Sequence, residues 1–186
     1  MKDTSTQFDE AVKLCEDVFL KKMHDYGTAW RILRPSSLTD QIYIKASRIR
    51  SIEEKGQQKI SDDIVDEFIG IVNYSSMALI QLAKGAVSEK ENVAMPYEDA
   101  KNIYEHYIKS AKALMMNKNH DYAEAWRDMR ISSLTDIILM KIFRLKQIED
   151  NNGELLISEG PEGSYNDIIN YAVFALILLQ EIKQKP

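Results

Sequence analysis

The chain of 186 residues is long enough to bury a core. Its 45% hydrophobic and 28% charged residues, with only 7 Gly and 4 Pro, exclude disorder and argue against a loop-rich all-β fold. A formal net charge of −5 excludes the broad basic surface that would draw the protein onto nucleic acid or an anionic membrane. The single cysteine, and an N-terminal stretch without the apolar core of a signal peptide, lead us to expect a cytoplasmic protein.

The first predicted helix runs roughly from Thr6 to Met23. Phe8, Val12 and Cys15 recur at spacings of four and three, which places them on one buried face. Because Cys15 lies on this apolar face, we expect a buried structural thiol rather than a nucleophile.

A polar segment follows this helix and occurs twice in the chain. "HDYGTAWRILRPSSLTD" (24–40) and "HDYAEAWRDMRISSLTD" (120–136) agree at 12 of 17 positions. Their aromatic and cationic side chains suit the base and the phosphate of a nucleotide. In the alternative interpretation each tryptophan is a lid that closes the core of its unit. The candidate nucleotide-binding residues are Asp25, Tyr26, Trp30 and Arg31 in the first occurrence and Asp121, Tyr122, Trp126 and Arg127 in the second.

The second predicted helix begins at "SSLTD". A Ser or Thr side chain would cap its free N–H groups there, and Asp40 suits the positive end of the helix dipole. Two cations then lie three residues apart on one helix face, Lys45 with Arg48 and, in the second occurrence, Lys141 with Arg144. Together with the helix start, these cations predict an anion site that binds phosphate.

The third predicted helix is apolar around most of its circumference. It is too short and too often interrupted by polar residues to span a membrane, so it belongs at the centre of a bundle. A carboxylate buried there needs a cation, because burying an unpaired charge is costly. Either the Lys and Arg of the second helix form an internal salt bridge with it, or the carboxylates hold Mg²⁺ that bridges to a bound phosphate. The candidate metal ligands are Asp66, Glu67, Glu162 and Asp167.

All three predicted helices occur twice. An offset of 96 aligns Lys45 with Lys141, and an offset of 97 aligns Asn73 with Asn170. We therefore divide this tandem duplication into a first repeat at 6–84, a linker at 85–96 and a second repeat at 97–184. A three-helix unit with an apolar third helix needs a partner. We predict an all-α fold in which the two units pack as one pseudo-twofold helical bundle.

The "HDYG…W" opening, the "K..R" pair and the "…D…NY" third helix together resemble the DUF1599 family, nucleotide modification associated domain 1. The resemblance covers about 8–82 and 97–179 and implies a role connected with nucleotides. Gly70, Gly163 and Ala123 depart from the family pattern, so neither repeat keeps all of its carboxylates. A composite site shared by the repeats is then the alternative to two independent ones.

A looser similarity connects the third helix with the all-α nucleotide pyrophosphohydrolases of the MazG and dimeric dUTPase type. It implies Mg²⁺ held by carboxylates over a nucleoside triphosphate. The paired "ExxE" of those enzymes is absent, because Lys45 and Arg48 fill its positions.

Three functions stay open at the level of the sequence. The first is a Mg²⁺-dependent nucleotide pyrophosphohydrolase, in which metal-held water attacks a phosphoryl group. The second is a non-catalytic nucleotide-binding or accessory domain. The third is a structural or oligomerising bundle whose repeated polar residues form an internal network. The sequence also leaves homo-oligomerisation open, and it gives no reason to expect a membrane or nucleic-acid partner.

Overall fold

The computed structural model describes residues 3–56, 62–155 and 160–184, without the side chains of residues 62, 63, 121 and 122. Within these ranges all regular structure is helical. The elements are α1 (Thr4–Tyr26), the short 3-10 helix η1 (Ala29–Ile32), α2 (Pro35–Glu54), α3 (Asp62–Lys84), α4 (Tyr97–Tyr122), the 3-10 helix η2 (Ala125–Asp128), α5 (Ile131–Asp150) and α6 (Pro161–Gln184).

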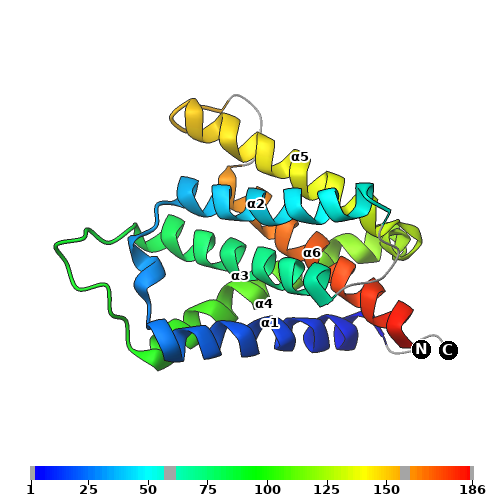
Figure 1. Ribbon diagram of the computed structural model, residues 1–186, viewed down its shortest axis with the longest axis horizontal. Coiled ribbons are helices and arrows are strands. Elements are labelled where there is room, and N and C mark those ends of the chain that lie inside the picture. Colours follow the sequence, from blue (N-terminus) through cyan, green and yellow to red (C-terminus); the bar gives the residue numbers. More distant parts are fainter. Residues whose placement is uncertain (1–2, 57–61, 156–159, 185–186) are drawn as a thin grey trace.

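The two most apolar helices, α3 and α6, form the centre of one bundle. Ile71, Val72 and Leu79 of α3 and Ile169 and Val173 of α6 are all buried. In Figure 1, α5, α2, α3 and α1 follow one another from top to bottom, while α6 and α4 lie behind them. The prediction of one all-α bundle built from two repeats is therefore confirmed.

Reciprocal contacts between α2 and α5 show the pseudo-twofold relation of the repeats. The Thr39 hydroxyl donates to Glu149 of α5 at 2.7 Å. The corresponding Thr135 donates to Glu53 of α2 at 3.0 Å. Two further ion pairs are related in the same way, Lys146 with Asp40 at 2.6 Å and Arg50 with Asp136 at 3.6 Å. Each contact from α2 to α5 therefore has a counterpart from α5 to α2, as a twofold relation requires.

The starts of α2 and α5 correct one expectation. Arg34 and Arg130 occupy the capping positions, and neither helix start has a side-chain cap. Pro35 instead occupies the first turn of α2, where its fixed φ and missing N–H fit a helix start. The predicted Ser or Thr cap is wrong, since "SSLTD" already lies inside each helix.

Asn73 and Asn170 connect the central helices to α1 and α4. Their side-chain N–H groups donate to the backbone carbonyls of Cys15 and Ala111, each at 3.0 Å. Cys15 is fully buried, and burial raises the pKa of its thiol. The prediction of a buried structural cysteine is confirmed.

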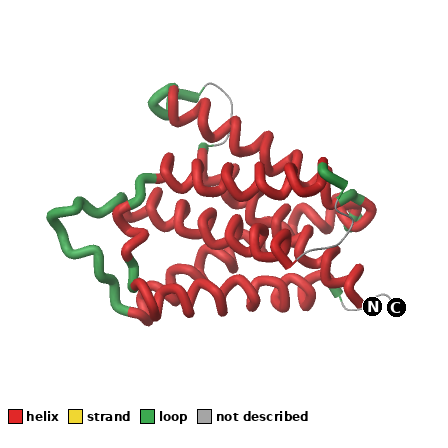
Figure 2. Tube along the Cα trace, in the orientation of Figure 1, coloured by secondary structure: helices red, strands yellow, loops and turns green. Residues whose placement is uncertain are grey.

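A long loop joins α3 to α4 (Figure 2). It is attached to η1 at both of its ends. Val87 N–H donates to the Arg31 carbonyl at 2.8 Å, and Met95 N–H donates to the Thr28 hydroxyl at 2.9 Å. None of the helices in the described ranges is long and apolar enough to cross a membrane.

Candidate functional site

The cations of the "K..R" pairs lie in the middle of α2 and α5, ten and thirteen residues after the first residue of each helix. Lys45 follows Pro35 by ten residues, so the two are about 15 Å apart along the helix axis. The predicted anion site that joins the cations to the start of their own helix therefore does not form. Lys45, Arg48 and Lys141 instead bind carboxylates in the second turns of α3 and α6.

In the first repeat both cations bind one carboxylate. Glu67 accepts from Lys45 Nζ at 3.1 Å and from Arg48 at 2.9 Å, and its side chain is only 8% exposed. Gly70 leaves the room for the lysine, because a Cβ at this position would lie 2.4 Å from Lys45 Cε. The first repeat therefore contains the internal salt bridge that was one of the two interpretations of its sequence.

In the second repeat the carboxylate lies one helical turn later. Asp167 accepts from Lys141 Nζ at 2.6 Å and from Lys118 Nζ of α4 at 2.8 Å. Burial raises the pKa of Asp167, but the hydrogen bonds and charges of the two lysines outweigh this effect and hold the pKa below its ordinary value. Asp167 is therefore an ionised carboxylate in a lysine bridge.

Because of this shift of one turn, Arg144 has no carboxylate at the position where Arg48 binds Glu67. Ser164 occupies the position of Glu67, and Gly163 occupies the position of Asp66. Arg144 forms no ion pair with any residue in the described ranges. Its guanidinium is therefore a cation without a counter-ion in the described part of the chain.

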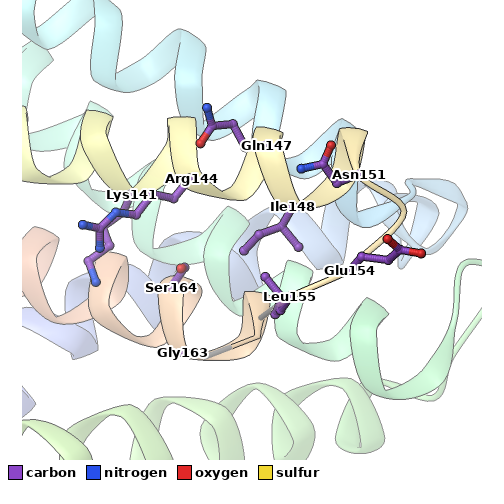
Figure 3. Close-up of a pocket in the computed structure, with 9 residues that line it drawn as sticks. All are labelled: Lys141, Arg144, Gln147, Ile148, Asn151, Glu154, Leu155, Gly163 and Ser164. Carbon is purple, nitrogen blue, oxygen red and sulfur yellow. The ribbon is translucent and has the colours of Figure 1, made fainter. Parts of the chain in front are cut away.

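Arg144 faces a groove between α5 and the beginning of α6. The groove has a volume of about 550 Å³. Figure 3 shows the cations at one end, next to Ser164, Ile148 and Leu155 facing each other further along, and Glu154 beyond them. The lining residues are Lys141, Arg144, Gln147, Ile148, Asn151, Glu154, Leu155, Gly163 and Ser164. Sequence reasoning identified only the two cations as site residues. Comparing Glu67 with its counterpart Ser164 would have indicated where the groove opens.

The arginines of the repeated segment bind within the protein. Arg31 is 7% exposed and donates to Gln81 of α3, and burial lowers the pKa of its guanidinium. Arg127 donates to Thr4, Gln7, Glu124 and Glu181 at 2.6 to 3.1 Å. These contacts hold η1 and η2 in place, and the two guanidiniums are not part of the groove.

The two tryptophans differ in how far they are covered. Trp126 is 6% exposed and stacks on Phe174, with ring centroids 4.2 Å apart and an interplanar angle of 3°. The Arg127 guanidinium carbon lies 4.5 Å from the Trp126 centroid, so both ring faces are occupied. Trp30 is partly buried beside Phe19. Trp126 therefore has the position of a lid, and its ring faces are closed to a stacked base.

Asp25 and Tyr26 lie at the C-terminal end of α1. Tyr26 is 73% exposed, and Asp25 is paired with His24 at 3.2 Å. The side chains of Asp121 and Tyr122 lie outside the described part of the structure. The structure thus does not bring Asp25 or Tyr26 to the Arg144 groove, whose lining contains neither.

The four candidate metal ligands do not gather at one point. Glu67 and Asp167 lie in different repeats, each beside two cations, while Asp66 and Glu162 are exposed. Among the described residues no three His, Cys, Asp or Glu side chains are placed to hold a metal ion. Mg²⁺ binding stays a prediction that these contacts do not support.

The fold and this site define a class of protein: an all-α bundle of two pseudo-twofold repeats, each with a lysine–arginine pair facing its central helix. Both repeats match the DUF1599 family, described as nucleotide modification associated domain 1, at residues 22–82 and 118–179. The chain belongs to this family. No curated protein and no solved structure matches this chain. The family description connects the chain with nucleotides without assigning it a reaction.

Proposed function

We propose that the second repeat binds a nucleotide through its phosphate, in the groove between α5 and α6, without turning it over. The observation that carries this proposal is the difference between Glu67 and Ser164. One carboxylate pairs with both cations of the first repeat, whereas Ser164 leaves Arg144 unpaired among the described residues.

The groove contains the groups that a phosphate needs. A guanidinium binds two phosphate oxygens at once, and Ser164 adds a hydroxyl donor. Gly163 and Ser164 belong to the first turn of α6, where the helix dipole also favours an anion. The volume of about 550 Å³ lies within the usual range for small-molecule sites.

Binding without turnover fits the carboxylates better than hydrolysis does. Glu67 and Asp167 each accept hydrogen bonds from two cations. A divalent cation at either carboxylate would have to displace those cations first, at the cost of breaking charge-assisted hydrogen bonds. Among the described residues, no contact therefore favours the hydrolase alternative.

The test compares Arg144→Ala with the matched variant Arg48→Ala by calorimetric titration with nucleoside phosphates. We expect Arg144→Ala to weaken binding by about 10- to 100-fold, the loss of one charge-assisted contact, with little change in melting temperature. Arg48→Ala should retain binding and melt at a lower temperature, because it removes a partner of the buried Glu67. Unchanged affinity in Arg144→Ala would refute the proposal.

A second measurement separates binding from catalysis. The protein is incubated with nucleoside triphosphates, with and without Mg²⁺, and pyrophosphate is measured. We expect none above the background, and Mg²⁺-dependent release that scales with protein concentration would favour the hydrolase instead.

A further inference from the structure

The outer face of the α2–α5 layer carries large apolar side chains. The two helices pack against each other and against α3 and α6, and they form the upper edge of the bundle in Figure 1. On their outer side Ile44, Met140 and Phe143 are 57%, 43% and 56% exposed. Together with the partly buried Tyr43, these three residues form what we call the α2–α5 patch.

The members of the α2–α5 patch are neighbours. Tyr43 of α2 packs edge-on against Phe143 of α5, with ring centroids 6.0 Å apart and an interplanar angle of 68°. Ile44 follows Tyr43 directly, and Met140 lies one helical turn before Phe143. The patch is therefore one apolar surface across two helices rather than a set of scattered residues, and a contiguous apolar surface of this kind marks a contact site.

The pseudo-twofold relation of the repeats extends to the patch. Ile44 and Met140 are counterparts at the offset of 96, while Phe143 has Ser47 as its counterpart. Both repeats therefore keep a large apolar side chain at the same exposed position, although neither side chain belongs to the buried core. A surface with this internal symmetry suits a partner that presents the same surface in return.

Two ion pairs flank the patch, Lys146 with Asp40 and Arg50 with Asp136. Each aspartate lies near the start of its helix, and a cation of the same helix follows it by ten residues. The four charges sum to zero. An acidic or a basic partner would need flanking charges of one sign, so these pairs favour neither.

The direction of the helices makes this face complementary to itself. α2 and α5 are antiparallel, since the start of each helix contacts the end of the other. A twofold axis in the plane of the patch, whether parallel or perpendicular to the helices, therefore places each helix of one copy against an antiparallel helix of the other. The aspartate of each helix then faces a cation of the other copy, and the apolar centres face each other.

The size of the face is adequate for a stable contact. α2 and α5 have 20 residues each. Two such helices side by side are about 30 Å long and about 20 Å wide, a plan area of about 600 Å². Because side chains make the accessible surface larger than the plan area, this face approaches the roughly 800 Å² per partner of a standard interface.

We infer that a second copy of this chain covers the α2–α5 patch, so that α2 and α5 of the two copies form a four-helix contact around a twofold axis. Ile44, Met140 and Phe143 of both copies lie at its centre and lose their contact with water. The inference does not depend on the proposed function, because no residue of the patch lines the Arg144 groove.

Sedimentation velocity of the full chain at micromolar concentrations tests this inference. The wild type should show a monomer–dimer equilibrium. Ile44→Lys combined with Met140→Lys should raise the dissociation constant by at least about 100-fold, because apolar burial is lost and like charges meet across the twofold axis. The matched control is Leu14→Lys with Leu114→Lys, at leucines of α1 and α4 that are 40% and 44% exposed. The control should dimerise like the wild type.

Three outcomes would overturn the inference. A wild type that stays monomeric at every concentration would leave the patch to a different protein. A dimer that both double variants form equally well would use another face of the bundle. A dimer that both variants lose equally would not depend on the α2–α5 patch in particular.

Hydrogen exchange of the wild type tests the same contact without a substitution. The chain is compared at concentrations below and above the dissociation constant. Amides of α2 and α5 that exchange by local opening should exchange more slowly at the higher concentration, while those of α1 and α4 should not change. Slower exchange confined to α1 and α4 would contradict the inference.

Discussion

At the scale of single residues, the position of one carboxylate decides which cations are free. Glu67 lies opposite Lys45 and Arg48, whereas Asp167 lies one turn later and binds Lys141 together with Lys118. A salt bridge between these cations and a carboxylate of the third helix was one of the two interpretations of the sequence, and the structure contains such a bridge at Lys45 and at Lys141. The contribution of Lys118 was not predictable, because it comes from a different helix and depends on how α4 packs against α6.

The roles of the Arg and Trp residues in the repeated segment could not be predicted from the local sequence alone. A Trp–Arg pair in sequence fits both a core lid, which is the commoner case, and a nucleotide pocket. Gln81 of α3 and Gln7 of α1, which hold Arg31 and Arg127, are far from them along the chain. Only the packed fold therefore decides between the two interpretations.

Asp167→Asn tests the lysine bridge. The change should destabilise the protein by about 2 kcal/mol, because it removes the carboxylate that Lys118 and Lys141 share. The pKa of Asp167 is lowered in the folded state, so its stabilisation is complete above the ordinary value of 3.8 and is lost as the pH falls through the lower folded pKa. Urea unfolding across the acidic range should show the variant and the wild type converging at low pH. Asp66→Asn, at an exposed site, should unfold like the wild type at every pH.

At the scale of elements, the contact between α2 and α5 contains two half-buried glutamates. Glu53 and Glu149 each accept a hydrogen bond from a threonine of the opposite helix. Burial, more than any other effect, raises the pKa of both carboxyls, and a nearby aspartate adds to this in each case. The helices themselves were predictable from apolar spacing. Their starts were not, because Arg34 and Arg130 are not typical capping residues.

The double variant Glu53→Gln, Glu149→Gln tests these carboxyls. A raised folded pKa gives stability that is complete below the ordinary value of 4.5 and is lost as the pH rises through the folded pKa. Glutamine can keep the acceptor oxygen and never ionises. The variant should therefore melt at a higher temperature than the wild type near neutral pH, and the difference should shrink below pH 4.5. A variant that melts at a lower temperature at neutral pH would show that the charged carboxylates stabilise the contact.

At the scale of the whole molecule, the two repeats share a single core. The duplication was visible in the sequence, and the apolar third helices indicated that the repeats would pack together. The difference in polar contacts at the centre was not predictable. Tyr104 satisfies Asn73, while Phe8 leaves Asn170 with an unpaired oxygen.

Separating the repeats between α3 and α4 tests the shared core. Each half exposes its apolar central helix, so neither should fold as a monomer. We expect the isolated halves to show little cooperative melting, and an equimolar mixture to recover a melting transition and a 1:1 complex by light scattering. Two stable monomeric halves would contradict the single bundle.

Covalent fusion of the repeats permits a difference that a symmetric dimer of single repeats cannot have. In such a dimer every substitution appears twice, so both grooves would carry Glu67, or both would carry Ser164. Within one chain each copy mutates separately, and here one copy keeps the closed ion pairs. The other copy is then free to change its surface, because its partner maintains the scaffold that both depend on.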